Sequence, residues 1–248
     1  MKLTNLVAFG LLTTIPLVGH AQRASAPAAK PAPSGERFEV SSIKAVRPTL
    51  VNTIAALQKR DVASAKAAFE AFDSGWNGIE VYISTRDPEM YGALEQGYQA
   101  RIAKGLTDPK PNTTTLLADA QAMLAKYDEA VRMIEKAAPL NPLYDDVARL
   151  RIVRAHLREV NPALKAGDMT KARKSFDAFN DRWDSIEDLV KARSTDAYTA
   201  IEKGMIQIER ALMPAKPDPN QVTTMVSGVM DQYNAIVARV TKEARSSR

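Results

Sequence analysis

Residues 69–80 read FEAFDSGWNGIE, and residues 176–187 read FDAFNDRWDSIE. The two stretches are offset by 107 residues, and each contains one of the two tryptophans of the chain. The same offset continues downstream, so that 11 of the 29 positions in residues 69–97 are identical in the second copy. Self-similarity of this length indicates an internal duplication. Because the period is far longer than a solenoid unit, it predicts two tandem domains rather than an array.

Each copy is expected to fold as a four-helix bundle, which makes the fold class all-α. Phe69, Phe72 and Trp76 recur at spacings of three and four, the period of a helix with one buried face. No segment shows the period-two alternation of a half-buried strand. We place helical bundle repeat 1 at residues 39–138 and repeat 2 at residues 143–248. The expected helices cover residues 42–59, 61–85, 87–104 and 113–137 in the first copy, and residues 144–166, 168–193, 195–212 and 220–245 in the second.

The N-terminal segment is typical of a secretory signal peptide. Residues 1–21 contain Lys2, then an apolar run interrupted by Pro16, then small residues before a cleavage site predicted after Ala21. Residues 22–38 are rich in Ala, Pro and Ser, which predicts a linker without a packed core. The sequence therefore predicts a protein of the periplasm or the extracellular space, with no transmembrane segment in the mature chain.

Composition excludes several classes of site. The chain has no Cys and two His, so zinc held by thiolates or by several imidazoles, thioether-linked haem and a Cys nucleophile are not expected. There is no phosphate loop and no hydrolase or metalloprotease motif. The net charge of +5 is spread among many acidic residues, so no nucleic-acid partner is expected. We predict that the protein is not an enzyme.

Polar residues on the apolar stripes are the strongest candidates for a site. In the first copy, Glu80 follows Trp76 by four residues, and Tyr91 and Glu95 share a face of the next helix. The second copy repeats these residue types at the same spacing. A carboxylate on a buried face must be paired, protonated or bound to a metal. The candidate metal ligands are Glu80, Glu95, Glu187, Glu202, Tyr91 and Tyr198.

Two interpretations of these residues stay open. In the structural one, Arg86 and Arg193, which also repeat, satisfy glutamates, and the tyrosine hydroxyls donate further hydrogen bonds. In the other, the carboxylates and phenols bind iron or another hard cation such as Ca²⁺ or Mn²⁺. Carboxylates on facing helices are a known metal site of four-helix bundles, although this chain lacks the Glu-x-x-His motif of di-iron bundles.

The repeated pattern also resembles a known family. It is similar to a helical extracytoplasmic domain associated with bacterial high-affinity iron permease systems. The residues that carry this resemblance are Phe69, Phe72, Trp76, Glu80, Tyr91 and Glu95, and again Phe176, Phe179, Trp183, Glu187, Tyr198 and Glu202. The resemblance implies an accessory part in iron transport, with a membrane iron permease or another periplasmic protein as the partner. The chain has no Arg-Glu-x-x-Glu transport motif, so it does not resemble the pore itself.

Two functions are therefore predicted from the sequence. The first is an exported helical protein that binds metal, with iron as the first candidate, and assists its uptake without catalysis. The alternative is a periplasmic protein–protein interaction module whose buried carboxylates are purely structural.

Overall fold

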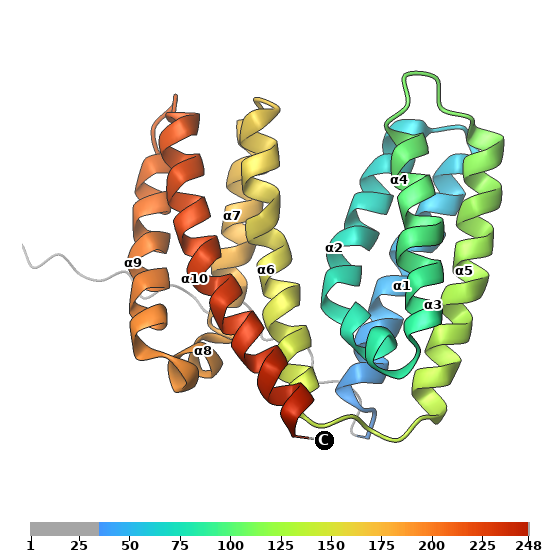
Figure 1. Cartoon of the computed structure of the whole chain (residues 1–248). Coiled ribbons are helices and arrows are strands. Elements are labelled where there is room, and N and C mark those ends of the chain that lie inside the picture. Colours follow the sequence, from blue (N-terminus) through green and yellow to red (C-terminus); the bar gives the residue numbers. More distant parts are fainter. Residues whose placement is uncertain (1–34, 248) are drawn as a thin grey trace, which may run out of the picture. The chain divides into compact units, whose positions relative to one another are not determined.

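The computed structural model describes residues 35–247 and is entirely helical over that range, apart from the connecting turns (Figure 1). The predicted all-α fold class is confirmed, since no strand occurs among these residues. The predicted signal peptide, residues 1–21, and residues 22–34 of the predicted linker lie outside the described residues. The first helix begins at Phe38, one residue before the predicted start of repeat 1.

We call residues 38–136 the first half and residues 143–246 the second half. The first half contains α1 (Phe38–Gln58), α2 (Val62–Arg86), α3 (Pro88–Gly92), the π-helical η1 (Ala93–Gln99), α4 (Ala100–Leu106) and α5 (Thr113–Lys136). The second half contains α6 (Leu143–Lys165), α7 (Met169–Trp183), α8 (Glu187–Arg193), α9 (Thr195–Leu212) and α10 (Pro219–Ser246). In the first half α1 packs against α2 and α5, and in the second half α6 packs against α7 and α10. Helices α2 and α6 pack together and join the halves.

Matching turns connect the first two helices of each half. Arg60 and Gly167 both adopt left-handed backbone conformations, with φ of 58° and 73°. The next residue caps the following helix in both cases: Asp61 accepts a hydrogen bond from a backbone N–H of the first turn of α2, and Asp168 does so in α7. Glycine adopts this conformation without strain, whereas Arg60 does not, so only the second half has the residue best suited to the turn.

A cluster of aromatic rings fills the centre of each half. Phe72, Trp76 and Tyr127 are fully buried, and their ring centroids lie 5.8–6.4 Å apart. The Tyr127 hydroxyl donates a hydrogen bond of 2.6 Å to the carbonyl of Ile43 in α1. The corresponding cluster of the second half consists of Phe179, Trp183 and Tyr233, whose hydroxyl donates to the carbonyl of Leu150 at 2.7 Å. A buried phenol needs such an acceptor, so the hydrogen bond fixes which helix each ring packs against.

Two predicted helices differ from their expected form. The helix expected at residues 168–193 is interrupted between α7 and α8, because Ser185 directs both its N–H and its hydroxyl to the carbonyl of Arg182, at 3.1 and 2.6 Å. A serine side chain competes in this way with the regular helical hydrogen bond. The helix expected at residues 87–104 extends to Leu106, but η1, at its centre, is a π-helical segment. The counterpart of η1 in α9 is a regular α-helix.

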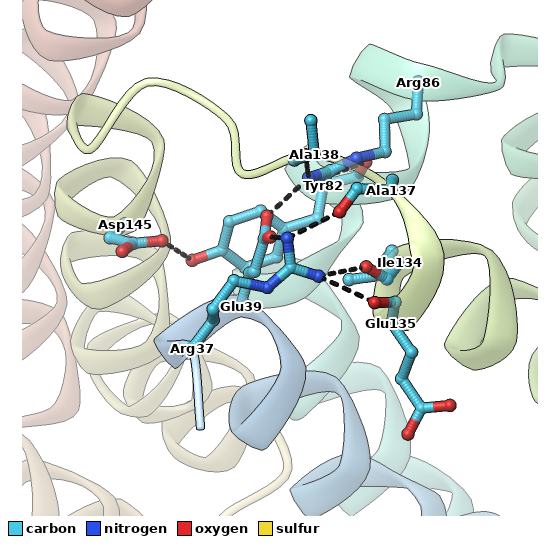
Figure 2. A network of polar contacts seen from close by, with 9 residues as sticks. All are labelled: Arg37, Glu39, Tyr82, Arg86, Ile134, Glu135, Ala137, Ala138 and Asp145. Carbon is cyan, nitrogen blue, oxygen red and sulfur yellow. Dashed lines mark hydrogen bonds and ion pairs between the residues drawn. The ribbon is translucent and has the colours of Figure 1, made fainter. Parts of the chain in front are cut away.

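A buried ionic network surrounds the start of α1 (Figure 2). Glu39 is 3% exposed, and its carboxylate pairs with Arg86 at 2.6 Å and with Arg37 at 3.0 Å. Arg37 also donates to the carbonyls of Ile134 and Ala137, at the end of α5, where carbonyl groups lack helical partners. The network therefore ties α1, α2 and the last turn of α5 together.

Tyr82, next to this network, forms a hydrogen bond to the second half (Figure 2). This fully buried tyrosine of α2 donates a hydrogen bond of 2.7 Å to the carboxylate of Asp145, in the first turn of α6. Arg86 donates to the carbonyl of Ala138, in the segment that connects α5 with α6. The connection between the halves is thus held by side chains of α2 as well as by the chain itself.

Candidate functional site

Each half contains a hydrogen bond between an indole and a carboxylate. Trp76 of α2 donates its Nε1–H to Glu95 of η1, and Trp183, the last residue of α7, donates to Glu202 of α9. Both tryptophans are almost completely buried, so each indole N–H needs an acceptor inside the protein. The two glutamates that the sequence placed on the inner stripe are therefore acceptors for these buried donors.

A tyrosine covers each of these indoles. Tyr91 stacks on Trp76 with ring centroids 6.2 Å apart and an interplanar angle of 4°, and Tyr198 stacks on Trp183 at 6.3 Å and 17°. Desolvation, and after it the carboxylates of its own half, raise the pKa of the Tyr91 phenol. The pKa of Tyr198 is also raised, chiefly by the negative charge of Glu202. The six predicted ligands thus gather into two sets, each with two glutamates and one tyrosine.

Glu80 and Glu187 have different partners in the two halves. Glu80 forms an ion pair with Arg151 of α6 at 2.7 Å, across the contact between the halves. Glu187, at the start of α8, accepts a hydrogen bond of 3.4 Å from the hydroxyl of Tyr198. One of the two interpretations of the sequence had Arg86 and Arg193 satisfy glutamates, but neither arginine pairs with Glu80 or Glu187.

Arg86 and Arg193 instead pair with acids of the first helix of their own half. Arg86 pairs with Glu39, and Arg193 pairs with Asp146 at 3.3 Å. The reason lies in the spacing between each arginine and the repeated glutamate of the same half. Arg86 and Arg193 each follow the glutamate by six residues, whereas side chains share a helix face at spacings of three or four, so the arginine and the glutamate point in different directions.

Burial makes the carboxylates of the first set less acidic than usual. Desolvation raises the pKa of Glu80, which is 19% exposed; Arg151 opposes this shift, and the negative charge of Glu95 adds to it. Desolvation likewise raises the pKa of Glu95, while the hydrogen bond from Trp76 opposes that shift. Glu80 and Glu95 are therefore near enough to repel each other when both are ionised.

Each of the four glutamates has a hydrogen-bond or ion-pair partner in the protein. Among residues 35–247, no group of three or more His, Asp or Glu side chains has the arrangement needed to hold a metal ion. Two carboxylates and a phenol in each half are fewer ligands than the six to eight oxygens of a typical calcium site, unless water completes the shell.

Arg151 is the partner that sequence reasoning missed. It lies 71 residues from Glu80 in the chain, and no local pattern connects the two. A signal was nevertheless present: Arg151, Arg154 and Arg158 are spaced to lie on one side of α6. Arg158 donates to Asn77 of α2, on the same contact between the halves.

A groove lies between α2 and the helices α6 and α7. It has a volume of about 1010 Å³, and its lining includes Phe69, Leu106, His156, Lys171 and Arg182. Three polar residues of the lining are hydrogen-bonded to each other: Ser74 of α2 and Ser175 of α7 both donate to the carboxylate of Glu159 in α6. His156 has no counterpart in the first copy; it is half-buried here, and desolvation lowers its pKa.

Comparison of the chain with protein-family models, with curated proteins and with solved structures gave no match. Within the part of the chain that the structure describes, no helix has the length and apolar character needed to cross a membrane.

Proposed function

We propose that this chain is an exported, non-catalytic helical protein that acts by binding a partner protein, and that its repeated glutamates stabilise the fold. The observation that carries the structural role is the hydrogen bond from a buried tryptophan to Glu95 in one half and to Glu202 in the other. Each bond satisfies an indole N–H that is cut off from water, which is a sufficient reason for a carboxylate at these positions.

The proposal includes two four-helix bundles that arose by internal duplication. Equivalent contacts at offsets of 106 and 107 residues support it, beyond the sequence identities. Tyr127 and Tyr233 bond to the carbonyls of Ile43 and Leu150, and the indole–carboxylate bonds join equivalent residues. Duplicated bundles that share a seam between α2 and α6 offer a partner a surface that neither bundle has alone.

The groove between α2, α6 and α7 is the surface that we assign to the partner. Its volume of about 1010 Å³ is large enough for several side chains of a peptide segment. Apolar residues such as Phe69 and Leu106 line it together with Lys171 and Arg182, and aromatic residues and arginine are enriched at protein interfaces. Residues 1–21, with the sequence of a signal peptide, support a partner in the periplasm or outside the cell.

The structural role of the glutamates is tested by pairs of variants. Glu95→Gln keeps an acceptor for Trp76, and we expect it to change the free energy of unfolding by less than about 1 kcal/mol. Glu95→Ala leaves the indole N–H buried without a partner and is expected to cost about 1–3 kcal/mol. Glu202→Gln and Glu202→Ala are the matched pair in the second half. If the Gln and Ala variants lost equal stability, the indole hydrogen bond would not be the reason for the carboxylate.

Partner binding is tested by site-specific photo-crosslinking in the native host. A photoreactive residue replaces Lys174, which lines the groove and is exposed, or Gln207, which is exposed on α9 and lines no groove described above. We expect one discrete crosslinked product from the first position and none from the second. Equal crosslinking at both positions, or none at either, would contradict the assignment of the groove.

A second candidate is the binding of iron or another hard cation as an accessory to a membrane iron permease. The repulsion between Glu80 and Glu95 favours it, because a cation between the two carboxylates would relieve that repulsion. Calorimetric titration of the mature protein with Fe²⁺, Mn²⁺ and Ca²⁺ separates the candidates. Binding tighter than about millimolar that is lost in Glu95→Gln would favour the cation. Absence of such binding would leave the carboxylates a structural role only.

A further inference from the structure

A second groove lies between α6 and α10, and all the charged side chains that line it are positive. Its volume is about 620 Å³, and four cationic side chains line it: Arg151, Arg154, Lys242 and Arg245. Among the described residues, no Asp or Glu lines this groove. Asn234 and Thr241 of α10 supply polar groups between the cations. We refer to it as the α6/α10 groove.

The corresponding helices of the first half, α1 and α5, carry their own counterions. Arg47 of α1 forms a two-pronged ion pair with Asp128 of α5, at 2.7 and 2.9 Å. Lys44 of α1 pairs with Glu135 of α5 at 2.7 Å. Each of these two basic residues is therefore neutralised by an acid of the facing helix.

The second half has basic residues at the positions equivalent to Lys44 and Arg47, but no acidic residues at the positions equivalent to Asp128 and Glu135. At an offset of 107 residues, Lys44 and Arg47 correspond to Arg151 and Arg154. At the offset of 106 residues that holds for this part of the chain, Asp128 corresponds to Asn234 and Glu135 to Thr241. Neutral side chains thus stand in place of two carboxylates of the first half, and both of them line the α6/α10 groove.

The cations of the α6/α10 groove are poorly compensated as a result. Arg154 donates to the neutral amide oxygen of Asn234 at 3.0 Å, and Arg151 pairs with Glu80 of α2, which does not line the groove. The Nε atoms of both arginines are buried and have no hydrogen-bond partner among the described residues. Within residues 35–247, Lys242 and Arg245 have no ion pair.

Burial and like charge act together on Arg154. Desolvation lowers its pKa, the neighbouring charges of Arg151 and Arg158 lower it further, and Tyr233 and Glu80 oppose the shift. A guanidinium group stays protonated in proteins, so the unfavourable electrostatic energy persists in the folded state. An anion in the groove would offset this unfavourable electrostatic energy.

We propose that the α6/α10 groove binds a small oxyanion that carries two or more negative charges, of the phosphate or polycarboxylate class. The planar guanidinium groups of Arg151 and Arg154 match the paired oxygens of such anions, and Lys242 and Arg245 add charge. The ligand takes the place of the two carboxylates that Asp128 and Glu135 provide in the first half.

Calorimetric titration of the full mature chain with inorganic phosphate, pyrophosphate and citrate tests this proposal. We expect at least one of the three to bind with a dissociation constant below about 1 mM at low salt, and to bind more weakly as salt is added. Failure of all three anions to bind would overturn the proposal. Binding to vesicles containing anionic phospholipid, without binding of any free anion, would also overturn it in favour of a membrane surface.

Matched variants assign the binding to the groove. Asn234→Asp with Thr241→Glu restores the acids of the first half, and we expect anion affinity to fall at least tenfold while the thermal midpoint rises or stays unchanged. Thr199→Glu with Gln207→Glu on α9 adds the same charge at exposed positions outside the groove, and affinity should change by less than about threefold. Equal losses in the two double variants would show that net charge alone attracts the anion, and would refute the site. Because both double variants keep every arginine and lysine of the groove, their folding and their binding can be measured separately.

Discussion

The two halves of the molecule share an aromatic core but differ in how their charged side chains are satisfied. In the first half, Arg86 and Glu39 form a buried pair, and Arg47 and Asp128 a two-pronged one. In the second half the pair equivalent to the former, Arg193 and Asp146, is 20–24% exposed, and the acid equivalent to Asp128 is absent. The packing of large rings is therefore common to both halves, whereas the burial and the number of equivalent ion pairs differ between them.

A second difference concerns the long helix that carries the tryptophan. Helix α2 continues without interruption through Gly78, where α6 packs against it so closely that a Cβ atom would collide with Ile152. The corresponding residue in the second half is Ser185, at the break between α7 and α8. Only the helix that packs on the other half therefore requires a residue without a side chain at this position.

The largest expected difference between the halves concerns the buried ion pair. We expect Arg86→Ala to lower the free energy of unfolding by about 3–5 kcal/mol, because it removes the closest partner of the buried Glu39 carboxylate. Arg193→Ala, the matched variant, should cost at most about 1 kcal/mol, since that pair is partly exposed. Chemical denaturation of both variants measures this. Similar losses in the two would contradict the distinction drawn between the halves.

The contact between α2 and α6 is tested at Gly78. We expect Gly78→Ala to destabilise the protein by about 1–3 kcal/mol, because the added methyl group would collide with Ile152. Gly228→Ala in α10 is the control, since a Cβ there meets nothing within 4 Å. That substitution should stabilise the protein by about 0.5–1 kcal/mol through helix propensity. If Gly78→Ala left the free energy of unfolding unchanged, α2 and α6 would not be in close contact at this position.

The shared core predicts equal effects at the two buried tyrosines. Tyr127→Phe and Tyr233→Phe each remove one hydroxyl-to-carbonyl hydrogen bond and keep the ring. We expect each to lower the unfolding free energy by about 1 kcal/mol. Thermal denaturation of the two variants side by side checks this, and a difference above about 1 kcal/mol would show that the halves do not share this contact.

The smallest effect concerns the acid that the second half lacks. Asn234→Asp gives Arg154 a carboxylate partner like that of Arg47, and the expected gain is about 0.2–1 kcal/mol near pH 7. The hydrogen bonds from Arg47 hold the pKa of Asp128 below its usual value, and a similar lowering is expected for the carboxyl group introduced by this substitution.

The pH dependence of this gain follows from the direction of that shift. A carboxyl group with a lowered pKa stabilises the fold above its unfolded-state pKa of about 3.9, and that contribution is lost as the pH falls through the folded-state value. Unfolding free energies measured from neutral pH into acid should therefore converge for the variant and the parent protein. A gain that persists in acid would contradict the ion pair.

Much of the fold was predictable because its signals are local. Helices begin near the predicted residues wherever a capping side chain stands at the start, as Asp61, Asp87 and Asn112 do. The break at Ser185 was missed because a single serine is compatible with a helix. The π-helical η1 was missed because its residues have the same apolar spacing as a regular helix.

The candidate site was predicted only in part. Spacing along the helices correctly put Glu95 and Glu202 on inner faces, where each meets a tryptophan. The same reasoning did not identify the partner of Glu80, since Arg151 comes from the other half of the chain. Periodicity gives the face on which a side chain lies, but it does not give the residue that faces it.

The sequence by itself determined that the chain contains two copies of one helical pattern, because periodic apolar residues and caps act over one or two turns of a helix. Only the tertiary structure decided which charges are compensated. The packing of α2 on α6 brings Arg151 to Glu80, and the pairing of α6 with α10 leaves Arg154 facing an amide. Electrostatic energy depends on distances between groups that are far apart in the chain, and those distances exist only once the helices have packed.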